Sequence, residues 1–234
     1  MGINYNPQIS LNGLVLYLDA ANRKSYPGSG TTWTDLSGLG NTGTLVNGVG
    51  YTGSNGGSLS FDGSNDFVSC GNILNFTTEN FTFNMFFYYT STTTSNPNPG
   101  QGPVIVYKGQ YNANGYYLQL SQTNPSGAAF VTNQAGANQY TSSNSLLVVG
   151  AWNCISVVRN GPLVNIYING VDATAGSSGP HINPASSTNN FQLAAYANSI
   201  YSNLRISSFQ AYNRALSASE IQQNFNALRS RFGI

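Results

Sequence analysis

The sequence predicts an all-β fold in which two antiparallel sheets form a sandwich, with one short helix at the C-terminus. Apolar residues recur at every second position in several short runs, most clearly at Phe81, Phe83, Met85 and Phe87. This period of two is typical of β-strands. Asn-Gly pairs follow two such runs, and this dipeptide favours tight hairpin turns. Helical periodicity occurs only near the C-terminus, so a parallel α/β sheet is not expected.

Extended segments are expected along most of the chain, after a polar and extended arm at residues 1–12 that is free to order on a partner. The expected strands cover residues 14–18, 81–89, 104–108, 116–121, 128–132, 152–159, 163–169, 191–196 and 204–212. Segments rich in Gly, Ser, Thr or Pro predict long loops at residues 20–47, 90–102 and 173–190. Phe86 and Tyr88 occupy the second face of the strand at 81–89, which predicts a central strand covered on both sides.

Residues 57–71 have the pattern of a strand, a polar turn and a second strand. Leu59 and Phe61 alternate with serines, and Phe67 resumes an extended segment after the turn. The turn formers are Asp62, Gly63, Ser64 and Asn65. Glycine supplies the positive φ that such turns often require.

The C-terminal helix is expected over residues 217–230. Ser217 and Glu220 have the spacing of a capping box. An apolar stripe follows at helical spacing, formed by Ile221, Phe225 and Leu228. Arg229 and Arg231 lie where positive charge offsets the helix dipole, which accounts for the only basic cluster in the chain.

The composition excludes several classes of function. The net charge is +1 and the basic residues form no stripe, so no nucleic-acid partner is expected. The most apolar run, residues 81–89, is too short to span a bilayer, so no membrane partner is expected either. The N-terminus lacks a secretory signal, which predicts synthesis without a cleaved export signal. Only 6% of the residues are charged, and such a surface suits contact with other proteins.

Three tracts carry a family resemblance: residues 13–45, 57–71 and 206–232. Together they resemble the concanavalin A-like lectin/glucanase superfamily, in its laminin-G-like jelly-roll branch. The resemblance implies a jelly-roll domain over residues 13–234 that includes the closing helix. The first tract also resembles tailed-phage virion proteins that carry this domain.

The glucanase branch of the superfamily raises the possibility of catalysis. Retaining hydrolysis needs two carboxyl groups about 5–5.5 Å apart. The chain has only two glutamates, Glu79 and Glu220, and the capping box uses the second. His181 is expected to be a solvated loop histidine, because no nucleophile motif accompanies it. We therefore expect no enzyme activity, with a degenerate glucanase as the weakest alternative.

Metal binding is limited to a calcium hypothesis. Laminin-G-like domains often bind calcium through loop aspartates, and Asp62, Asn65 and Asp66 form the densest oxygen cluster here. The alternative is that Asp62 and Asn65 bond the backbone of their own turn, as Asp35 would. The two cysteines, Cys70 and Cys154, are expected to be buried free thiols, although a bridge between sheets is possible. No other cofactor is expected.

Aromatic residues in or beside loops are candidates for stacking on sugar rings: Tyr26, Trp33, Tyr51, Tyr111, Tyr140 and Tyr201. Loop tyrosines also suit contact with a protein. The expected function is a non-enzymatic virion structural protein, a capsid decoration (cement) or fibre-type protein that binds capsid or other particle proteins. It would belong to virions assembled in the host cytoplasm, and a homo-oligomer is compatible with the sequence. The alternative is a lectin-like module that binds a host surface polysaccharide.

Overall fold

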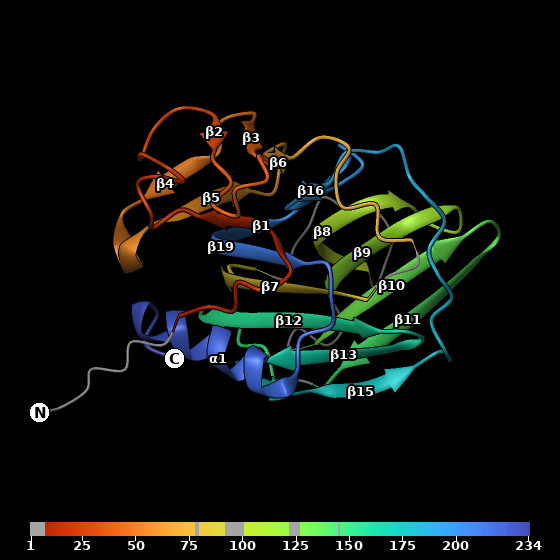
Figure 1. The fold of residues 1–234 in the computed structure, drawn as a ribbon. Helices are drawn as coiled ribbons and strands as arrows, with labels where there is room; N and C mark the ends of the chain where they lie inside the picture. The colour runs from red at the N-terminus through yellow and green to blue at the C-terminus, as the bar shows by residue number, and fades with distance from the viewer. Residues whose placement is uncertain (1–7, 78–79, 92–100, 122–126, 145) are drawn as a thin grey trace, which may run out of the picture.

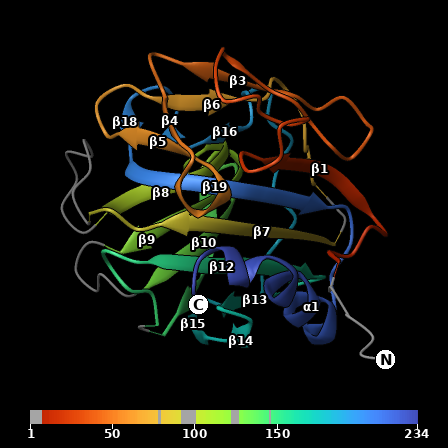
Figure 2. The same ribbon diagram turned by 90° about the vertical axis from the view of Figure 1, so that its left-hand side faces the viewer.

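The computed structural model describes residues 8–77, 80–91, 101–121, 127–144 and 146–234. Two antiparallel sheets, sheet A and sheet B, stack face to face, and helix α1 (Ala218–Leu228) lies against sheet A (Figures 1 and 2). The predicted all-β sandwich with one short C-terminal helix is confirmed. Within these residues, no helix has the length and apolar character needed to cross a membrane.

Sheet A is the layer against which the helix lies. Its spatial order is β14 (Val171–Asp172), β13 (Leu163–Ile168), β12 (Trp152–Asn160), β7 (Phe81–Tyr88), β19 (Asn203–Tyr212), β5 (Ser58–Asp62) and β4 (Gly50–Thr52). β1 (Leu14–Asp19) also pairs with β19. A short 3₁₀ turn (Ser54–Gly56) links β4 to β5.

Sheet B forms the other layer. Its spatial order is β15 (Thr174–Ser177), β11 (Ala137–Ser143), β10 (Ala128–Gln134), β9 (Asn114–Ser121), β8 (Gln101–Gln110), β16 (Gln192–Leu193), β6 (Phe67–Ser69), β3 (Gly43–Val46) and β2 (Thr32–Trp33). A separate hairpin is formed by β17 (Ala195–Tyr196) and β18 (Ile200–Tyr201).

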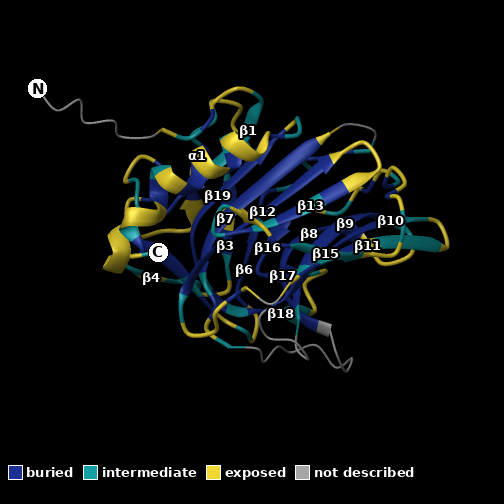
Figure 3. Ribbon diagram, turned by 90° about the horizontal axis from the view of Figure 1, so that it is seen from below, coloured by how far each residue is buried: buried dark blue, intermediate teal, exposed yellow. Residues whose placement is uncertain are grey.

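The main core lies between the sheets, whose strands are largely buried (Figure 3), and β7 is at its centre. Phe81 and Phe83 contact the sheet B residues Tyr116 and Phe130 at ring-centroid distances of 5.4–6.4 Å. Phe86 points the other way, where it stacks on rings from the C-terminal segment. The prediction of a central strand covered on both faces is therefore confirmed.

The turn after Asp62 passes between the two sheets instead of closing a hairpin. β5 pairs with β19 in sheet A, whereas β6 pairs with β3 and β16 in sheet B. Gly63 has φ +82°, and a Cβ there would lie 3.1 Å from the Cβ of Asn203. Glycine allows the chain to turn close to β19 while it changes layer.

The two Asn-Gly turns form as predicted. Asn160 pairs with Leu163 across the β12–β13 hairpin, and Gly161 has φ +58°. Asn169 and Gly170, with φ 51° and 80°, connect β13 to β14. Positive φ at both central residues is typical of the type I′ turn.

The helix is shorter than predicted, although its capping box is present. The Ser217 side chain accepts a hydrogen bond from the Glu220 backbone, and the Glu220 side chain accepts one from the Ser217 backbone. The α-helix ends at Leu228, and Arg229–Arg231 form a 3₁₀ turn. Arg231 lies at the end of this turn, as predicted, but its guanidinium also forms an ion pair with Asp19 that the sequence did not predict.

The start of the described chain is bound to the helix. The Ser10 backbone N–H donates to Asn224 Oδ1 at 2.7 Å, and the Ser10 carbonyl accepts from the Tyr212 hydroxyl at 3.0 Å. Ile9 packs against the cluster that contains Phe86. Residues 8–12 are therefore not free to order on a partner, in contrast to the expectation for the arm.

Two expected loops contain strands. β2 and β3 lie within residues 20–47, and β15 lies within 173–190. β11 also had no sequence signal, because its sequence ANQYTSS has few apolar residues to reveal a period of two. These strands lie at or beside sheet edges, where backbone pairing is not accompanied by a large buried face.

Candidate functional site

A row of outward-pointing side chains crosses sheet B. The strand registers align Gln192, Tyr107, Tyr117, Val131 and Tyr140 on neighbouring strands. Residues that alternate with them point inward and belong to the main core, including Leu118 and Phe130. Three members of the row, Tyr107, Tyr117 and Val131, instead form a separate buried cluster with Val104, and Tyr196 packs against it. We call this outer surface the tyrosine face.

The β17–β18 hairpin covers part of the tyrosine face. The Tyr196 ring lies 4.7 Å from the ring of Tyr107 and 5.7 Å, edge-on, from that of Tyr117. The Tyr111 backbone N–H donates to the Tyr196 hydroxyl at 2.9 Å. Ala194, with φ 64°, turns the chain from β16 onto the outer side.

Burial raises the pKa of the Tyr107, Tyr117 and Tyr196 hydroxyls, which are therefore neutral over the physiological pH range. The pKa of Tyr107 rises to about 12. The Tyr107 hydroxyl accepts from the Asn189 side-chain amide at 2.8 Å, so the phenol is held by an amide and not by a charged group. These groups act as neutral donors and acceptors.

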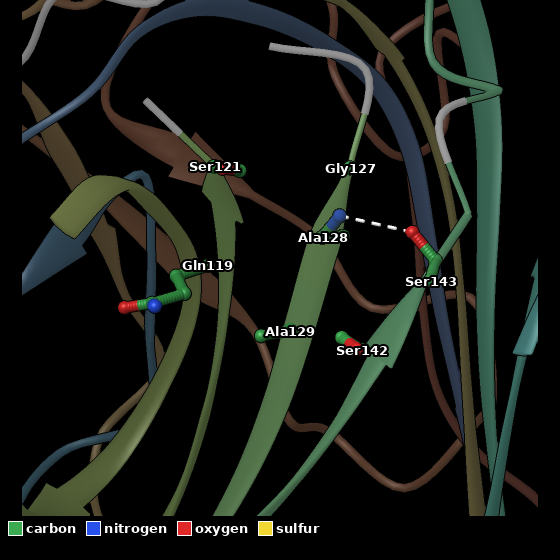
Figure 4. Close-up of a pocket in the computed structure, with 7 residues that line it drawn as sticks. All are labelled: Gln119, Ser121, Gly127, Ala128, Ala129, Ser142 and Ser143. Atoms are coloured by element: carbon green, nitrogen blue, oxygen red, sulfur yellow. Dashed lines mark hydrogen bonds between the residues drawn. The ribbon is translucent and has the colours of Figure 1, made fainter. Parts of the chain in front are cut away.

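A first hollow, of about 230 Å³, opens beside the tyrosine row at one end of β9, β10 and β11 (Figure 4). Gln119, Ala129 and Ser142 are aligned across the three strands on the outer side. The small side chains on β10 and β11 leave the space open. Nearby, the Ala128 backbone N–H donates to Ser143 Oγ at 2.9 Å and fixes the strand ends. Tyr140 stands two residues from Ser142 on the same side of β11.

A second hollow, of about 170 Å³, lies at the β16 end of the row. It is lined by Tyr107, Asn189, Asn190, Gln192, Ala197 and Asn198. The Gln192 side-chain amide donates to Asn198 Oδ1, while Gln192 Oε1 has no hydrogen-bond partner within the described residues. Both hollows thus combine amides or hydroxyls with nearby tyrosine rings.

The loop aromatics predicted as sugar-stacking residues divide into separate groups. Trp33 and Tyr26 are 0% and 3% exposed, so that prediction is wrong for them. Tyr51 lies on β4 of sheet A, whereas both hollows lie on sheet B. Tyr201 lies on the hairpin, where its ring is 6.2 Å from that of Phe67.

Tyr111 and Tyr140 are the two predicted aromatics that the structure brings to the tyrosine face. They are 48% and 46% exposed. Sequence reasoning missed Tyr107, Tyr117 and Tyr196. The spacing of Tyr117, Gln119 and Ser121 is the signal that could have identified an outer face, because these residues alternate with buried leucines.

Two of the three calcium candidates, Asp62 and Asp66, line a different groove of about 400 Å³, which is also lined by Thr90, Asn203 and Arg205. Asp62 Oδ1 accepts from the Ser64 backbone N–H at 2.7 Å, which confirms the turn-bonding alternative for Asp62. Asp66 Oδ2 accepts from the Asp62 backbone N–H at 3.3 Å. Burial and, second, the charge of Asp62 raise the pKa of Asp66.

The remaining oxygen candidates do not assemble into a ligand set. The backbone carbonyl of Asn65 accepts from the Asn47 side chain at 3.0 Å. Asp35 accepts from the backbone N–H groups of Ser37 and Asn41, as the turn-bonding alternative predicted. Within the described residues, no three His, Cys, Asp or Glu side chains gather as a metal site. Calcium binding at Asp62, Asn65 and Asp66 stays a hypothesis, and turn bonding stays the favoured alternative.

The candidates for catalysis have structural roles where the structure describes them. Glu220 is paired with Arg214, which, as the leading cause, lowers the pKa of the carboxyl to about 2. Glu79 lies outside the described residues. Cys70 and Cys154 are buried free thiols, as predicted.

His181 is buried, so the prediction of a solvated loop histidine is wrong. Its Nδ1 lies 2.8 Å from the Thr132 hydroxyl, and its Nε2 lies 2.9 Å from the Thr141 hydroxyl. Burial and, second, the positive charge of Arg159 lower the pKa of His181 to about 4. Threonines on two neighbouring strands therefore hold a neutral imidazole, a contact that the loop composition does not reveal.

The two stacked antiparallel sheets and the single C-terminal helix form a jelly-roll sandwich. Residues 61–222 match the family described as the concanavalin A-like lectin/glucanases superfamily. The chain belongs to this family. Comparison with curated protein sequences finds no match.

Several solved structures share the fold. The binding domain of Paraclostridial Mosquitocidal Protein 1 has a TM-score of 0.70 and 16% identity, over 92% of this chain and 52% of that chain. The botulinum neurotoxin serotype D binding domain has a TM-score of 0.66 and 13% identity, over 92% and 52%. A Trypanosoma rangeli sialidase has a TM-score of 0.64 and 16% identity, over 93% and 33%. The chain thus spans about half of each toxin domain, and at these identities the likeness shows the fold alone.

Proposed function

We propose that the chain is a carbohydrate-binding module and that its ligand lies on the tyrosine face. The observation that carries the proposal is the exposed ring of Tyr140, which stands beside the first hollow on the side of sheet B that points away from the core. Tyr107 and Tyr117 continue the same row but are buried beneath Tyr196, so they support the face from below. An aromatic ring offers an apolar body with a polar tip. The amides and hydroxyls of the two hollows supply the donors and acceptors that sugar hydroxyls require.

The family and the fold agree with this function. Lectins belong to the superfamily that the chain matches, and two of the similar structures are binding domains of toxins. The proposed ligand is the surface polysaccharide of a host cell, which is the alternative that the sequence predicts.

A glycan array with the full chain and a Tyr140→Ala variant tests the proposal. We expect selective binding by the unmodified chain and at least a tenfold weaker affinity for the variant, equivalent to about 1.4 kcal/mol. Tyr51→Ala is the matched control, because Tyr51 is 39% exposed but lies on sheet A. The absence of binding, or an equal loss in both variants, would contradict the proposal.

A second candidate is attachment to another protein, in the role of the virion structural protein that the sequence resemblance implies. The observation that favours it is an apolar segment between β11 and β12, where Leu146, Val148 and Val149 are 46%, 55% and 40% exposed. Exposed apolar side chains with few nearby charges suit a protein contact.

Attachment of this kind depends on apolar burial and should survive high salt. Screening at 1 M salt, where the Debye length is about 3 Å, weakens exposed ion pairs but leaves apolar burial intact. We expect the protein to stay on phage particles in 1 M NaCl and Val148→Ser to reduce its occupancy. Particles that shed the unmodified chain at moderate salt would exclude this mode of attachment.

A further inference from the structure

The strands that build the open part of the tyrosine face carry no charged side chain. No Asp, Glu, Lys or Arg occurs between Lys108 and Arg159, the stretch that forms β9, β10 and β11. None occurs between Asp172 and Arg205, the stretch that forms β15 to β18. A ligand on this face therefore meets rings, amides and hydroxyls.

The two cations that border the first stretch are turned away from the face. Lys108 is 1% exposed, and its ammonium donates to the Asn72 side chain and to the Asn189 carbonyl. Arg159 is also 1% exposed and lies on β12 in the other sheet. Neither side chain is placed to pair with an anion on the outer side of sheet B.

The absence of charge limits which sugars the face can hold. Carboxylate and sulfate groups bind well where Arg or Lys supplies a charge-assisted hydrogen bond. An anion that loses water without such a partner pays a desolvation penalty that neutral amides offset only in part. Neutral sugar hydroxyls have no such penalty, because amides and hydroxyls match them as donors and acceptors.

The two hollows are separated along the row. The first lies over β9 to β11 around Gln119 and Ser142, and the second lies beside β16 around Gln192 and Asn198. Three strand spacings separate β16 from β10, or about 14 Å at the usual strand separation. The buried Tyr117 ring lies between them, covered by the edge of the Tyr196 ring, so a ligand that spans the two hollows passes over the β17–β18 hairpin. A ligand that fills both hollows must be a chain of sugar rings.

We propose that the tyrosine face binds a neutral, extended polysaccharide chain that reaches from the first hollow to the second. Sialylated, uronic and sulfated glycans bind this face at least tenfold more weakly. The proposal rests on the carbohydrate-binding function proposed above and specifies the ligand of the same site.

The test measures binding of the full chain to matched probes. Neutral oligosaccharides of increasing length, from laminarin, mannan and amylose, are compared with sialyllactose, alginate and sulfated galactans. Lactose and carboxyl-reduced alginate are the neutral partners of the two carboxylated probes. We expect binding to at least one neutral series, affinity that rises with chain length, and the same affinity in 1 M NaCl.

Variants in each hollow test the span. Gln119→Ala in the first hollow and Asn198→Gly in the second should each lower the affinity for long oligosaccharides by more than that for short ones. Glycine at 198 keeps the positive φ of 54° that this turn position adopts. Asn226→Ala, on the exposed side of the helix, is the control and should have no effect. Ser142→Lys, which adds a cation to the first hollow, should raise the affinity for the anionic probes.

The outcomes separate this inference from the proposed function. Selective binding to anionic probes, or equal affinity for monosaccharides and long chains, overturns the inference and leaves the carbohydrate-binding function standing. Binding to none of the probes, neutral or anionic, overturns both.

Discussion

The Arg231 guanidinium donates to both carboxylate oxygens of Asp19, at 3.0 and 2.9 Å, and joins the C-terminal turn to the end of the first strand. The Asp19 side chain is 1% exposed, and it also accepts from the Tyr17 hydroxyl and the Ala21 backbone N–H. The donors satisfy the hydrogen-bonding capacity of a carboxylate that water does not reach.

Removal of the Arg231 charge is expected to destabilise the fold. Arg231→Gln leaves Asp19 buried without its cation, and we expect a loss of about 1–3 kcal/mol in the free energy of unfolding. Urea unfolding measures this loss. Arg229→Gln is the control, because Arg229 lies over the Phe225 ring and forms no ion pair within the described residues. Equal effects of the two substitutions would show that the ion pair contributes nothing.

The contact between Ser10 and the helix predicts a specific effect of truncation. Asn224→Ala removes the partner of the Ser10 backbone N–H and of the Tyr212 hydroxyl, both buried, and should cost about 1–3 kcal/mol. Deletion of residues 1–12 should lower the melting temperature, whereas deletion of residues 1–7 leaves these bonds in place. Asn226→Ala is the matched control on the exposed side of the helix. Identical melting temperatures for the two truncated chains would contradict the contact.

The buried His181 predicts pH-dependent stability. Its pKa is about 4 in the folded chain and about 6.5 when unfolded, so between these values the unfolded state binds the extra proton. Stability is therefore full above pH 6.5 and falls towards pH 4, by up to about 3 kcal/mol. His181→Gln should remove most of this slope when urea unfolding is measured across the window.

A comparison of the unmodified chain with His181→Gln isolates the effect of histidine titration, because the chain has only one histidine. Glu220 acts in a lower window, since its folded pKa of about 2 lies below its ordinary value and its contribution is lost as the pH falls through that range. The carboxylates are common to both proteins, so their effects cancel in the difference. Parallel slopes for the two proteins would show that His181 is not the titrating group.

Calcium should have little effect on stability. Asp62 already accepts a backbone hydrogen bond within its turn, which competes with a role as an ion ligand. A calcium site would instead add about 2.7 kcal/mol to the free energy of unfolding at a calcium concentration of one hundred times Kd. We expect EDTA and calcium to leave the melting temperature unchanged. A sharp decrease with EDTA that Asp62→Ala and Asp66→Asn both remove would establish a metal site.

Local sequence signals determined much of the architecture. Alternation at Phe81–Tyr88 identified the central strand, the two Asn-Gly pairs located their turns, and the Ser217 and Glu220 spacing located the helix start. These features depend on residues a few positions apart, so the sequence contains their causes.

The site was only partly predictable. Tyr111 and Tyr140 could be identified because they lie in or beside loops. Tyr116 and Tyr117 are neighbours of the same residue type, yet Tyr116 points into the core and Tyr117 outward. Only the polar Gln119 and Ser121 further along the strand indicate which face is the outer one. Alternation shows that a strand has two faces, but the partner layer decides which face is buried.

The sequence by itself determined most of the longer strands, the two Asn-Gly turns and the absence of charge along the stretch that forms β9 to β11. Only the tertiary structure decided that the turn after Asp62 changes sheets, that His181 is buried between threonines, and that Gln192 aligns with Tyr107 and Tyr117. The physical reason is that strand order and sheet stacking are set by contacts between residues far apart in the chain. Local patterns are compatible with many such pairings, and the packed core selects one of them.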